Sequence, residues 1–517
     1  MSSPDARATR PQASEATPAS AASGIARDLP RVLGIWSAAS ILIGSIIGSG
    51  VFVKPAAIAQ NLPSPGWILV CWIASGLLAL VGSLVFAELG SYYPRAGGQY
   101  TYLRESFGDL AAFLFGWTNL VIINSASIAA LAVMSARFLF NVFPEALRPA
   151  PGSHWFQTLP VLMILVLSAA NAAGVRWGAA IQNLLTVAKL AALGLIISAI
   201  VLPSRTSWSN LSPFWEIRGS PTSEAILAGF KGAFLAIFWA YDGWYLLSFS
   251  GAEIKNPRRN IPGGFILGML VVISTYVAAN LAYFILVPLE QMPSFGAGGG
   301  ASAEGSVAAE AVRRLFGPTG VVLLSLGIVC STLGAGNGNL LTGPRLSYAM
   351  ARDGLFFPIC GRLHEKFLTP VPAIALQGIL GAAYVYAGTF DQLTDSVVFA
   401  AWIFYLLTVA AIFKLRRRHA DLEGVFRAPG HPVVPASFVL FAAGFVVYSL
   451  YDAIAKALAS MSQPEGSKDG LYLILSSALI LGGLPIYWVV RARARARPLV
   501  AASVDTPGGA PRAPEPE

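Results

Sequence analysis

The sequence predicts an all-α, polytopic membrane protein with twelve transmembrane helices, of which the first and the sixth are broken. Its 517 residues are 55% hydrophobic and only 12% charged, whereas a soluble domain carries about 25% charged residues. Glycine-containing breaks interrupt two of the apolar segments, at Gly44–Phe52 and at Phe238–Trp244. Lipid cannot satisfy the backbone groups that a break exposes, so each break has to be buried or line a polar cavity.

Each span needs about 20 predominantly apolar residues, and twelve segments approach or exceed this length. The predicted spans are Leu33–Ala59, Trp67–Leu89, Phe107–Phe138, Leu159–Ala173, Ile181–Val201, Ile226–Phe249, Ile261–Val287, Gly320–Met350, Pro372–Ala387, Leu393–Leu415, Val434–Ala453 and Leu471–Val490. Most Lys and Arg residues of the short loops fall on the side of the N-terminus, among them the run Arg416-Arg417-Arg418. The positive-inside rule therefore places both termini in the cytoplasm of a multi-pass cell-membrane protein.

Breaks in spans one and six divide the chain into two five-helix repeats, residues 31–202 and 226–416, followed by two further helices in 434–490. Adjacent repeats with an odd number of spans are inserted upside down relative to each other, and such inverted repeats are a transporter architecture. Residues 1–30 and 498–517 are rich in small and polar residues and are expected to form disordered cytoplasmic tails.

Several classes of function are disfavoured by composition. Three cysteines in or beside apolar spans give no disulfide framework, and four scattered histidines give no metal cluster. The net charge of +9 lies in short loops and is not a nucleic-acid footprint. No catalytic pair of carboxylates is evident inside the spans, so we expect no enzyme, metal or cofactor.

The order of motifs resembles a known family. The motifs are Gly44-Ser45-Ile46-Ile47-Gly48-Ser49-Gly50-Val51-Phe52, Ala87-Glu88-Leu89-Gly90, and Ala240-Tyr241-Asp242-Gly243-Trp244 followed by Asn256-Pro257. Together they resemble the L-type amino acid transporters of the amino acid–polyamine–organocation superfamily, in a prokaryote-like form. The resemblance covers about residues 31–492. It implies a leucine-transporter-type fold, with a five-plus-five inverted repeat, and transport of an amino acid by alternating access.

The chemistry of an amino acid fits the first break. Successive backbone N–H groups at the start of the second half-helix attract an anion, and the unwound segment begins at Ile47. The resemblance implies that the substrate carboxylate lies on Gly48, Ser49 and Gly50. It also implies that carbonyls near Ile46 and near Trp239 accept the substrate ammonium.

Other candidate residues come from the second break and from neighbouring spans. Trp239 matches an aromatic residue that gates the pocket in the family, and Ala240, Asp242 and Gly243 line the break. Asp242 either favours small or cationic substrate side chains or caps the second half-helix. The remaining candidates are Asn124 in span three, as a polar wall, and Trp402 in span ten, as a pocket aromatic.

Lys189 lies well within span five, where a lysine costs at least about 2.5 kcal/mol and usually faces a functional interior. The resemblance implies that it occupies the place of a sodium ion, near carbonyls around Gly44 and polar groups near Asn339. Transport would then be independent of sodium. A proton-coupled symporter with Lys189 as titrating group is the alternative, and an amino acid sensor with a transporter fold is a remote one.

Animal members of this family are joined to a glycoprotein through a cysteine in the loop between helices three and four. The corresponding loop, residues 141–158, contains no cysteine. We therefore expect no disulfide-linked heavy subunit.

Overall fold

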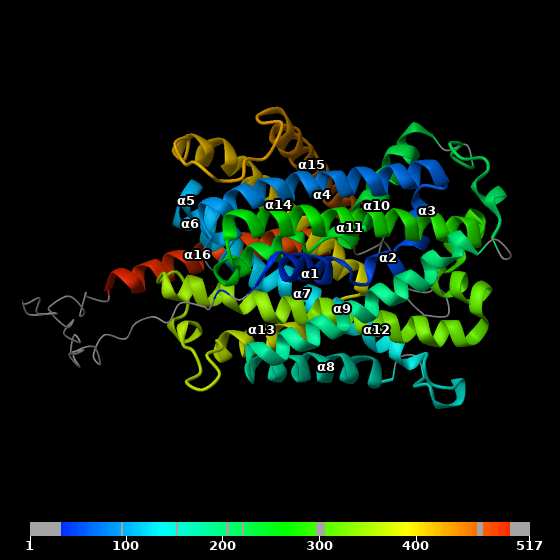
Figure 1. Cartoon of the computed structure of the whole chain (residues 1–517), viewed down its shortest axis with the longest axis horizontal. Helices are drawn as coiled ribbons and strands as arrows, with labels where there is room; N and C mark the ends of the chain where they lie inside the picture. Colours follow the sequence, from blue (N-terminus) through cyan, green and yellow to red (C-terminus); the bar gives the residue numbers. More distant parts are fainter. Residues whose placement is uncertain are drawn as a thin grey trace, which may run out of the picture.

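The computed structural model describes residues 31, 33–94, 97–150, 153–202, 206–219, 222–295, 306–462 and 469–496. The two predicted tails lie outside these residues. Every regular element in the described part is a helix, apart from one isolated bridge between Leu33 and Ile254. The long helices run roughly along the longest dimension of the molecule and form a single bundle (Figure 1). The prediction of an all-α membrane protein is confirmed.

The first half of the bundle contains the helices of the first five predicted spans. They are α1 (Ile35–Ile46), α2 (Gly50–Val53), α3 (Pro55–Asn61), α4 (Pro65–Tyr92), α5 (Gln99–Phe107), α6 (Asp109–Thr118), the π-helix η1 (Asn119–Asn124), α7 (Ser125–Phe140), α8 (Trp155–Ala172), α9 (Val175–Ile197) and the 3-10 helix η3 (Ser198–Val201).

The second half and the two additional helices follow the same order as the prediction. They are α10 (Ser223–Tyr241), the 3-10 helix η6 (Trp244–Glu253), α11 (Pro257–Leu286), α12 (Val307–Arg352), α13 (Val371–Tyr384), α14 (Phe390–Arg418), α15 (Val433–Ser462) and α16 (Asp469–Ala496). Short 3-10 helices between the spans are η2 (Glu145–Leu147), η5 (Trp208–Leu211), η7 (Leu289–Phe295) and η9 (Pro358–Gly361).

Ten helical segments of the described chain are long and apolar enough to cross a membrane. The helices of the first and ninth predicted spans are shorter than these ten. Helix α1 has 12 residues because it ends at the break, and α13 has 14 residues. Helix α12 is longer than the predicted span because it includes a helix of the preceding loop. The two parts join at Gly317, whose φ of 67° is not helical.

Both predicted breaks are present. Helix α1 ends at Ile46, and the chain becomes helical again at Gly50. Helix α10 ends at Tyr241, Asp242 is extended, and Gly243 adopts a φ of 100° before η6 begins. A side chain at Gly243 would be strained by this φ, and its Cβ would lie 2.9 Å from the Ser45 carbonyl oxygen.

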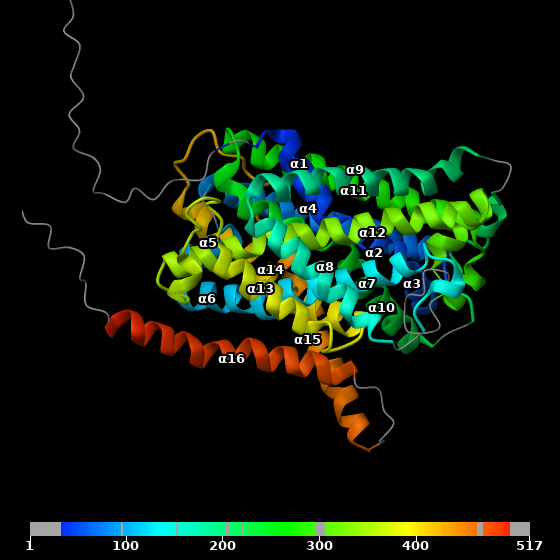
Figure 2. The same cartoon turned by 90° about the horizontal axis from the view of Figure 1, so that it is seen from below.

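The broken helices lie inside the bundle. Helix α1 packs on α11, α12 and η6, while α2 packs on α10 and α12. Helices α7 and α9 cover α12, and α16 runs along the outside of the bundle, joined to it by α15 (Figure 2). The two breaks are thus shielded from lipid by the surrounding spans, as their unpaired backbone groups require.

The end of the bundle at which α1 begins and α14 ends is fastened by one buried carboxylate. Glu88 has no exposed surface. Its two carboxylate oxygens accept bonds from Arg416 Nε at 2.7 Å and Arg416 Nη2 at 2.5 Å. The Tyr92 hydroxyl and the Ala428 N–H donate to the same carboxylate, each at 2.6 Å. Glu88 therefore ties α4 to α14 and to the loop after it.

We expect Glu88→Ala to destabilise the protein by about 3–5 kcal/mol, because it leaves the Arg416 guanidinium without its counter-ion and the Ala428 N–H without its acceptor. The matched control is Glu105→Ala, whose partner Arg418 is 60% exposed at 3.4 Å. An exposed pair contributes less than about 1 kcal/mol. Thermal unfolding of the purified variants in detergent measures the difference, and equal melting temperatures would contradict this role for Glu88.

Candidate functional site

A small polar cavity lies where the two breaks meet. Its empty volume, which includes the part open to its surroundings, is about 340 Å³. It is lined by Ser45, Ile46, Gly48, Ser49, Gly50, Ser127, Leu131, Trp239, Asp242, Gly243, Ala335 and Asn339. The structure thus brings most of the predicted site residues together around one space.

Backbone donors face this cavity from the first break. The first hydrogen bond of the second half-helix runs from Phe52 N to Ser49 O at 3.1 Å. The N–H groups of Gly48, Ser49 and Gly50 precede it and therefore have no acceptor within the helix. Lys54 keeps a helical conformation, so α2 and α3 act as one half-helix. Its positive end points to the cavity and favours an anion.

Carbonyl acceptors of both breaks converge on one hydroxyl. Tyr276 of α11 donates to Ile46 O at 3.2 Å or to Ala240 O at 2.9 Å. Ile47 O does not face the cavity, because it accepts bonds on its other side from Lys189 and Ser331. The ends of α1 and α10 are therefore held together by Tyr276.

Trp239 covers the cavity. Its indole Nε1 donates to Ser49 Oγ at 3.2 Å, and its ring meets Phe390 edge-on with 6.0 Å between centroids. Above Phe390, Lys54 Nζ lies 2.6 Å from Asp391 Oδ1 and so links the first broken helix to α14. These contacts close one end of the cavity.

The opposite end is closed by contacts of the chain before α1. Leu33 N donates to Glu253 O at 3.0 Å, and Lys255 N donates to Leu33 O at 2.8 Å. Arg345 Nη2 of α12 lies 3.0 Å from Glu253 Oε1, with both side chains about 10% exposed or less. These contacts join the chain before α1 to η6 and α12, at the end of the bundle opposite to Lys54 and Asp391.

Asp242 stands between this cavity and a second one. Its Oδ1 accepts a 2.6 Å bond from the Tyr405 hydroxyl. The second cavity, of about 280 Å³, is lined mainly by aromatic side chains: Phe238, Tyr241, Trp244, Trp402, Tyr405 and Phe438, with Ser75 and Ala79. Trp402 lies here, stacked on Phe438 with ring centroids 5.6 Å apart. The predicted pocket aromatic is thus beyond Asp242 and does not line the cavity at the first break.

Lys189 is fully buried and lies behind the first break. Its ammonium donates to Gly44 O at 2.8 Å and to Ile47 O at 2.6 Å. Ser331 of α12 donates to Ile47 O or Gly48 O, each at 3.0 Å. The ammonium and the hydroxyl occupy the position in which a cation would meet carbonyl oxygens of the unwound turn.

Two predicted polar residues are placed differently. Asn339 lines the cavity and donates to Ala335 O at 3.2 Å, so the polar group of α12 beside the Lys189 carbonyls is Ser331 instead. Asn124 is buried and donates to Asn119 Oδ1 at 2.7 Å across the π-helix η1. The residue of α7 that reaches the cavity is Ser127, almost one helical turn later.

The π-helix and Ser331 were not anticipated. Single π-turns inside α-helices are frequent at functional sites, and here η1 leads directly into the helix that supplies Ser127 and Leu131. Ser331 and Thr332 are adjacent hydroxyl residues in an apolar run, which is the signal that points to a polar contact at this depth.

Comparison with known proteins agrees with this geometry. The family model described as amino acid permease matches residues 33–468. The chain is 32% identical over 466 residues to the b(0,+)-type amino acid transporter 1 of Homo sapiens, covering 89% of this chain and 88% of the relative. It is 31% identical over 467 residues to the serine/threonine exchanger SteT of Bacillus subtilis (strain 168), covering 90% and 98%. Identity to the large neutral amino acids transporter small subunit 2 of Homo sapiens is 30% over 485 residues, covering 92% and 83%. With two broken helices around one polar cavity and matches that span nearly its whole length, this chain belongs to the amino acid permease family.

Proposed function

We propose that the protein is a sodium-independent amino acid transporter, an exchanger or facilitator that works by alternating access. The observation that carries this proposal is the Lys189 ammonium on the carbonyls of Gly44 and Ile47. A fixed positive charge there does what a bound sodium ion would do, because it neutralises the carbonyl dipoles of the unwound turn. The relatives named as a serine/threonine exchanger and as amino acid transporters support the transport of amino acids.

The substrate carboxylate binds the N–H groups of Gly48, Ser49 and Gly50. These donors need no side chain and lie at the positive end of a half-helix. The substrate ammonium binds carbonyls at the ends of the two preceding half-helices, at Ile46 and Trp239. Ile46 O retains a lone pair for this purpose beside its bond from Tyr276.

Asp242 determines which class of substrate side chain the site accepts. It lies at the point where the first cavity meets the aromatic one, so a substrate side chain leaving the first cavity meets its carboxylate. Small or cationic side chains fit this position better than large apolar ones. The competing reading is that Asp242 only caps η6, and uptake of arginine against serine and leucine distinguishes the two.

Alternating access requires the two closures to open in turn. The Lys54–Asp391 pair and Trp239 form the outer closure, on the side opposite the termini, and the Arg345–Glu253 pair with the Leu33 backbone forms the inner one. We place both termini in the cytoplasm, so that the outer closure faces outside the cell. A proton-coupled symporter with Lys189 as the titrating group remains the second candidate, since Lys189 is the buried titratable group beside the break.

Gly48→Ala tests the carboxylate site. Its Cβ would make only ordinary contacts, at 3.4 Å with Leu131 and 3.5 Å with Ala335, so the fold should persist. Uptake in proteoliposomes should fall at least about tenfold, because a methyl group stands where the carboxylate approaches the backbone. Gly336→Ala is the control, since its Cβ meets Leu131 at 4.0 Å and lies outside the cavity lining. Normal uptake by Gly48→Ala would remove the assignment.

Replacing sodium with choline should leave uptake by the wild-type protein unchanged, because Lys189 supplies the cation. Lys189→Ala should lose most uptake, since it leaves the carbonyls of Gly44 and Ile47 without a partner in a buried site. Leu190→Ala, at a residue 36% exposed on the same helix, should retain uptake. A strict sodium requirement would overturn the proposal. Transport by Lys189→Ala that no longer responds to a pH gradient would favour the proton-coupled alternative.

The purified chain should transport amino acids without a heavy subunit. Residues 141–158 contain no cysteine, while Cys71 and Cys360 are buried and Cys330 is half-buried in α12. A partner's thiol therefore has no exposed cysteine in that loop to join. The measurement is uptake by liposomes containing only this chain, and activity that appears only when a second membrane protein is added would contradict the expectation.

A further inference from the structure

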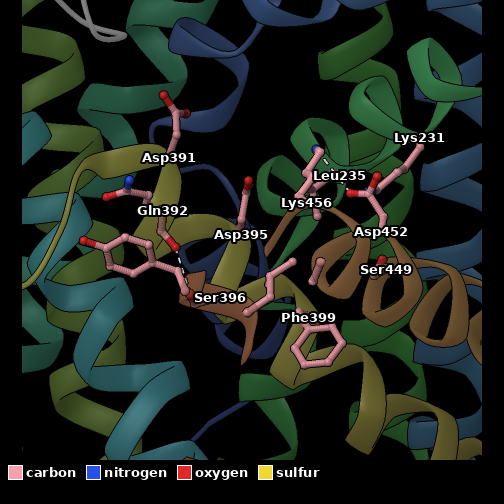
Figure 3. Close-up of a pocket in the computed structure, with 13 residues that line it drawn as sticks. Lys231, Leu235, Asp391, Gln392, Asp395, Ser396, Phe399, Ser449, Asp452 and Lys456 are labelled. Atoms are coloured by element: carbon pink, nitrogen blue, oxygen red, sulfur yellow. Dashed lines mark hydrogen bonds and ion pairs between the residues drawn. The ribbon is translucent and has the colours of Figure 1, made fainter. Parts of the chain in front are cut away.

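We propose a second amino acid site between α10, α14, α15 and α16, in a pocket that shares no lining residue with the cavity of the two breaks. The inference rests on the proposed transport of amino acids. A pocket lies between these four helices, with an empty volume of about 660 Å³ that includes its part open to solvent, and Figure 3 shows its lining. Its polar residues include three carboxylates, two ammonium groups and three hydroxyls, from Asp391, Asp395, Asp452, Lys231, Lys456, Ser396, Ser449 and Tyr472.

The charges are divided between two walls. Figure 3 shows Asp391, Asp395 and Ser396 of α14 on one side, and Lys231, Asp452 and Lys456 of α10 and α15 on the other. Lys231 and Asp452 form an ion pair, and Lys456 Nζ lies 3.2 Å from Asp452 Oδ2. Acidic groups thus face basic groups across the space of the pocket.

A buried hydroxyl in this pocket has no partner in the protein. Ser449 of α15 is 3% exposed, and its Oγ has no hydrogen-bond partner. Buried polar groups are normally satisfied by protein, water or a ligand. Ser449 lines the pocket, so an unpaired hydroxyl lies in its wall.

The acidic wall is held in place by the start of α14. Thr389 and Gln392 form a capping box, with Gln392 Oε1 accepting from Thr389 N at 3.0 Å and Thr389 Oγ1 accepting from Gln392 N at 3.4 Å. This fixes the first turn of the helix, on which Asp391 lies, and Asp395 follows one turn later. The wall is therefore formed before any ligand arrives, which lowers the cost of binding.

Opposed charges on two walls of one pocket fit a zwitterion. An amino acid would place its ammonium against Asp395 and Asp391, its carboxylate toward Lys456 and Lys231, and its side chain on Leu235 and Phe399. A simple anion would meet three carboxylates, and a simple cation would meet two ammonium groups. An amino acid satisfies both walls at once.

The pocket shares one residue with the outer closure of the transport cavity. Asp391 lines the pocket and also pairs with Lys54 at 2.6 Å. An ammonium placed beside Asp391 competes with Lys54 for that carboxylate and weakens the closure. An amino acid in this site is thus positioned to promote opening of the path to the transport cavity.

Binding to the purified full chain in lipid nanodiscs tests the site, with tritiated L-serine, L-leucine and L-arginine as probes. Gly48→Ala should lose the probe bound at the transport site and keep the probe bound at the second site. Adding Asp395→Asn should weaken the remaining binding at least about tenfold. Adding Ile454→Ala instead, at a residue of α15 that is 45% exposed, should leave it unchanged.

A labelling experiment covers the case in which Asp395→Asn does not fold. In a chain with Cys71, Cys330 and Cys360 replaced by alanine, Leu235→Cys, at a half-buried residue of the pocket lining, should be protected from a maleimide by the bound probe, also in the Gly48→Ala background. Ile454→Cys should not be protected.

The outcomes separate this site from the proposed function, which wild-type uptake measures independently. If the wild type takes up amino acids, but binding and protection both vanish in Gly48→Ala, the second site alone is overturned. Binding and protection that persist in Gly48→Ala, with no uptake of any amino acid by the wild type, overturn the proposed function and support the site. Loss of all binding overturns the site whatever the uptake.

Discussion

The rest of this structure depends on one contact, between the Lys189 ammonium and the broken turn of the first helix. A lysine inside the bilayer is costly, and so are backbone carbonyls that a helix has released. Here each satisfies the other, because Lys189 donates to Gly44 O and Ile47 O, and Ser331 adds a hydroxyl to the same turn. The break that creates the cavity is therefore stabilised by the ammonium behind it.

The two breaks also hold each other in position. Gly50 packs so tightly on α10 that a Cβ there would lie 2.4 Å from Ala240 Cα. Gly243 approaches the Ser45 carbonyl with similar closeness, and Tyr276 bonds to the carbonyls of Ile46 and Ala240. A displacement of α10 must therefore move α1 as well. This mechanical link is what a cavity needs if it is to open on alternate sides while keeping its shape.

Much of this arrangement was accessible from sequence because its signals are local. Glycines in an apolar run marked both breaks, and a lone lysine in span five marked the contact behind the first. Asn339 was expected beside Lys189, yet Ser331 takes that place, eight residues or about 12 Å earlier along the same helix. The register of one span against another depends on packing along their whole length, which one sequence does not reveal.

The same limit applies to Trp402 and to η1. The sequence showed that residue 402 is aromatic. Its position on the far side of Asp242 depends on its stacking on Phe438 of α15, which the sequence did not show. The π-helix spans Asn119–Asn124, and the side chains of these two residues meet across it. Neither residue type by itself predicts a π-helix. Gly50 shows the same limit, because its close neighbour is the backbone of α10, which the chain reaches only 190 residues later.

The two closures differ in what has to be broken to open them. The outer one depends on Lys54 and Asp391, and Asp391 is 54% exposed, so water already competes for that carboxylate. The inner one combines a mostly buried ion pair with two backbone hydrogen bonds of Leu33. Buried backbone groups need new partners when they separate, and all of these contacts end on the chain between Glu253 and Lys255. A segment that closes the inner path through its backbone, at the end of the second broken helix, links opening on that side to a movement of η6 itself.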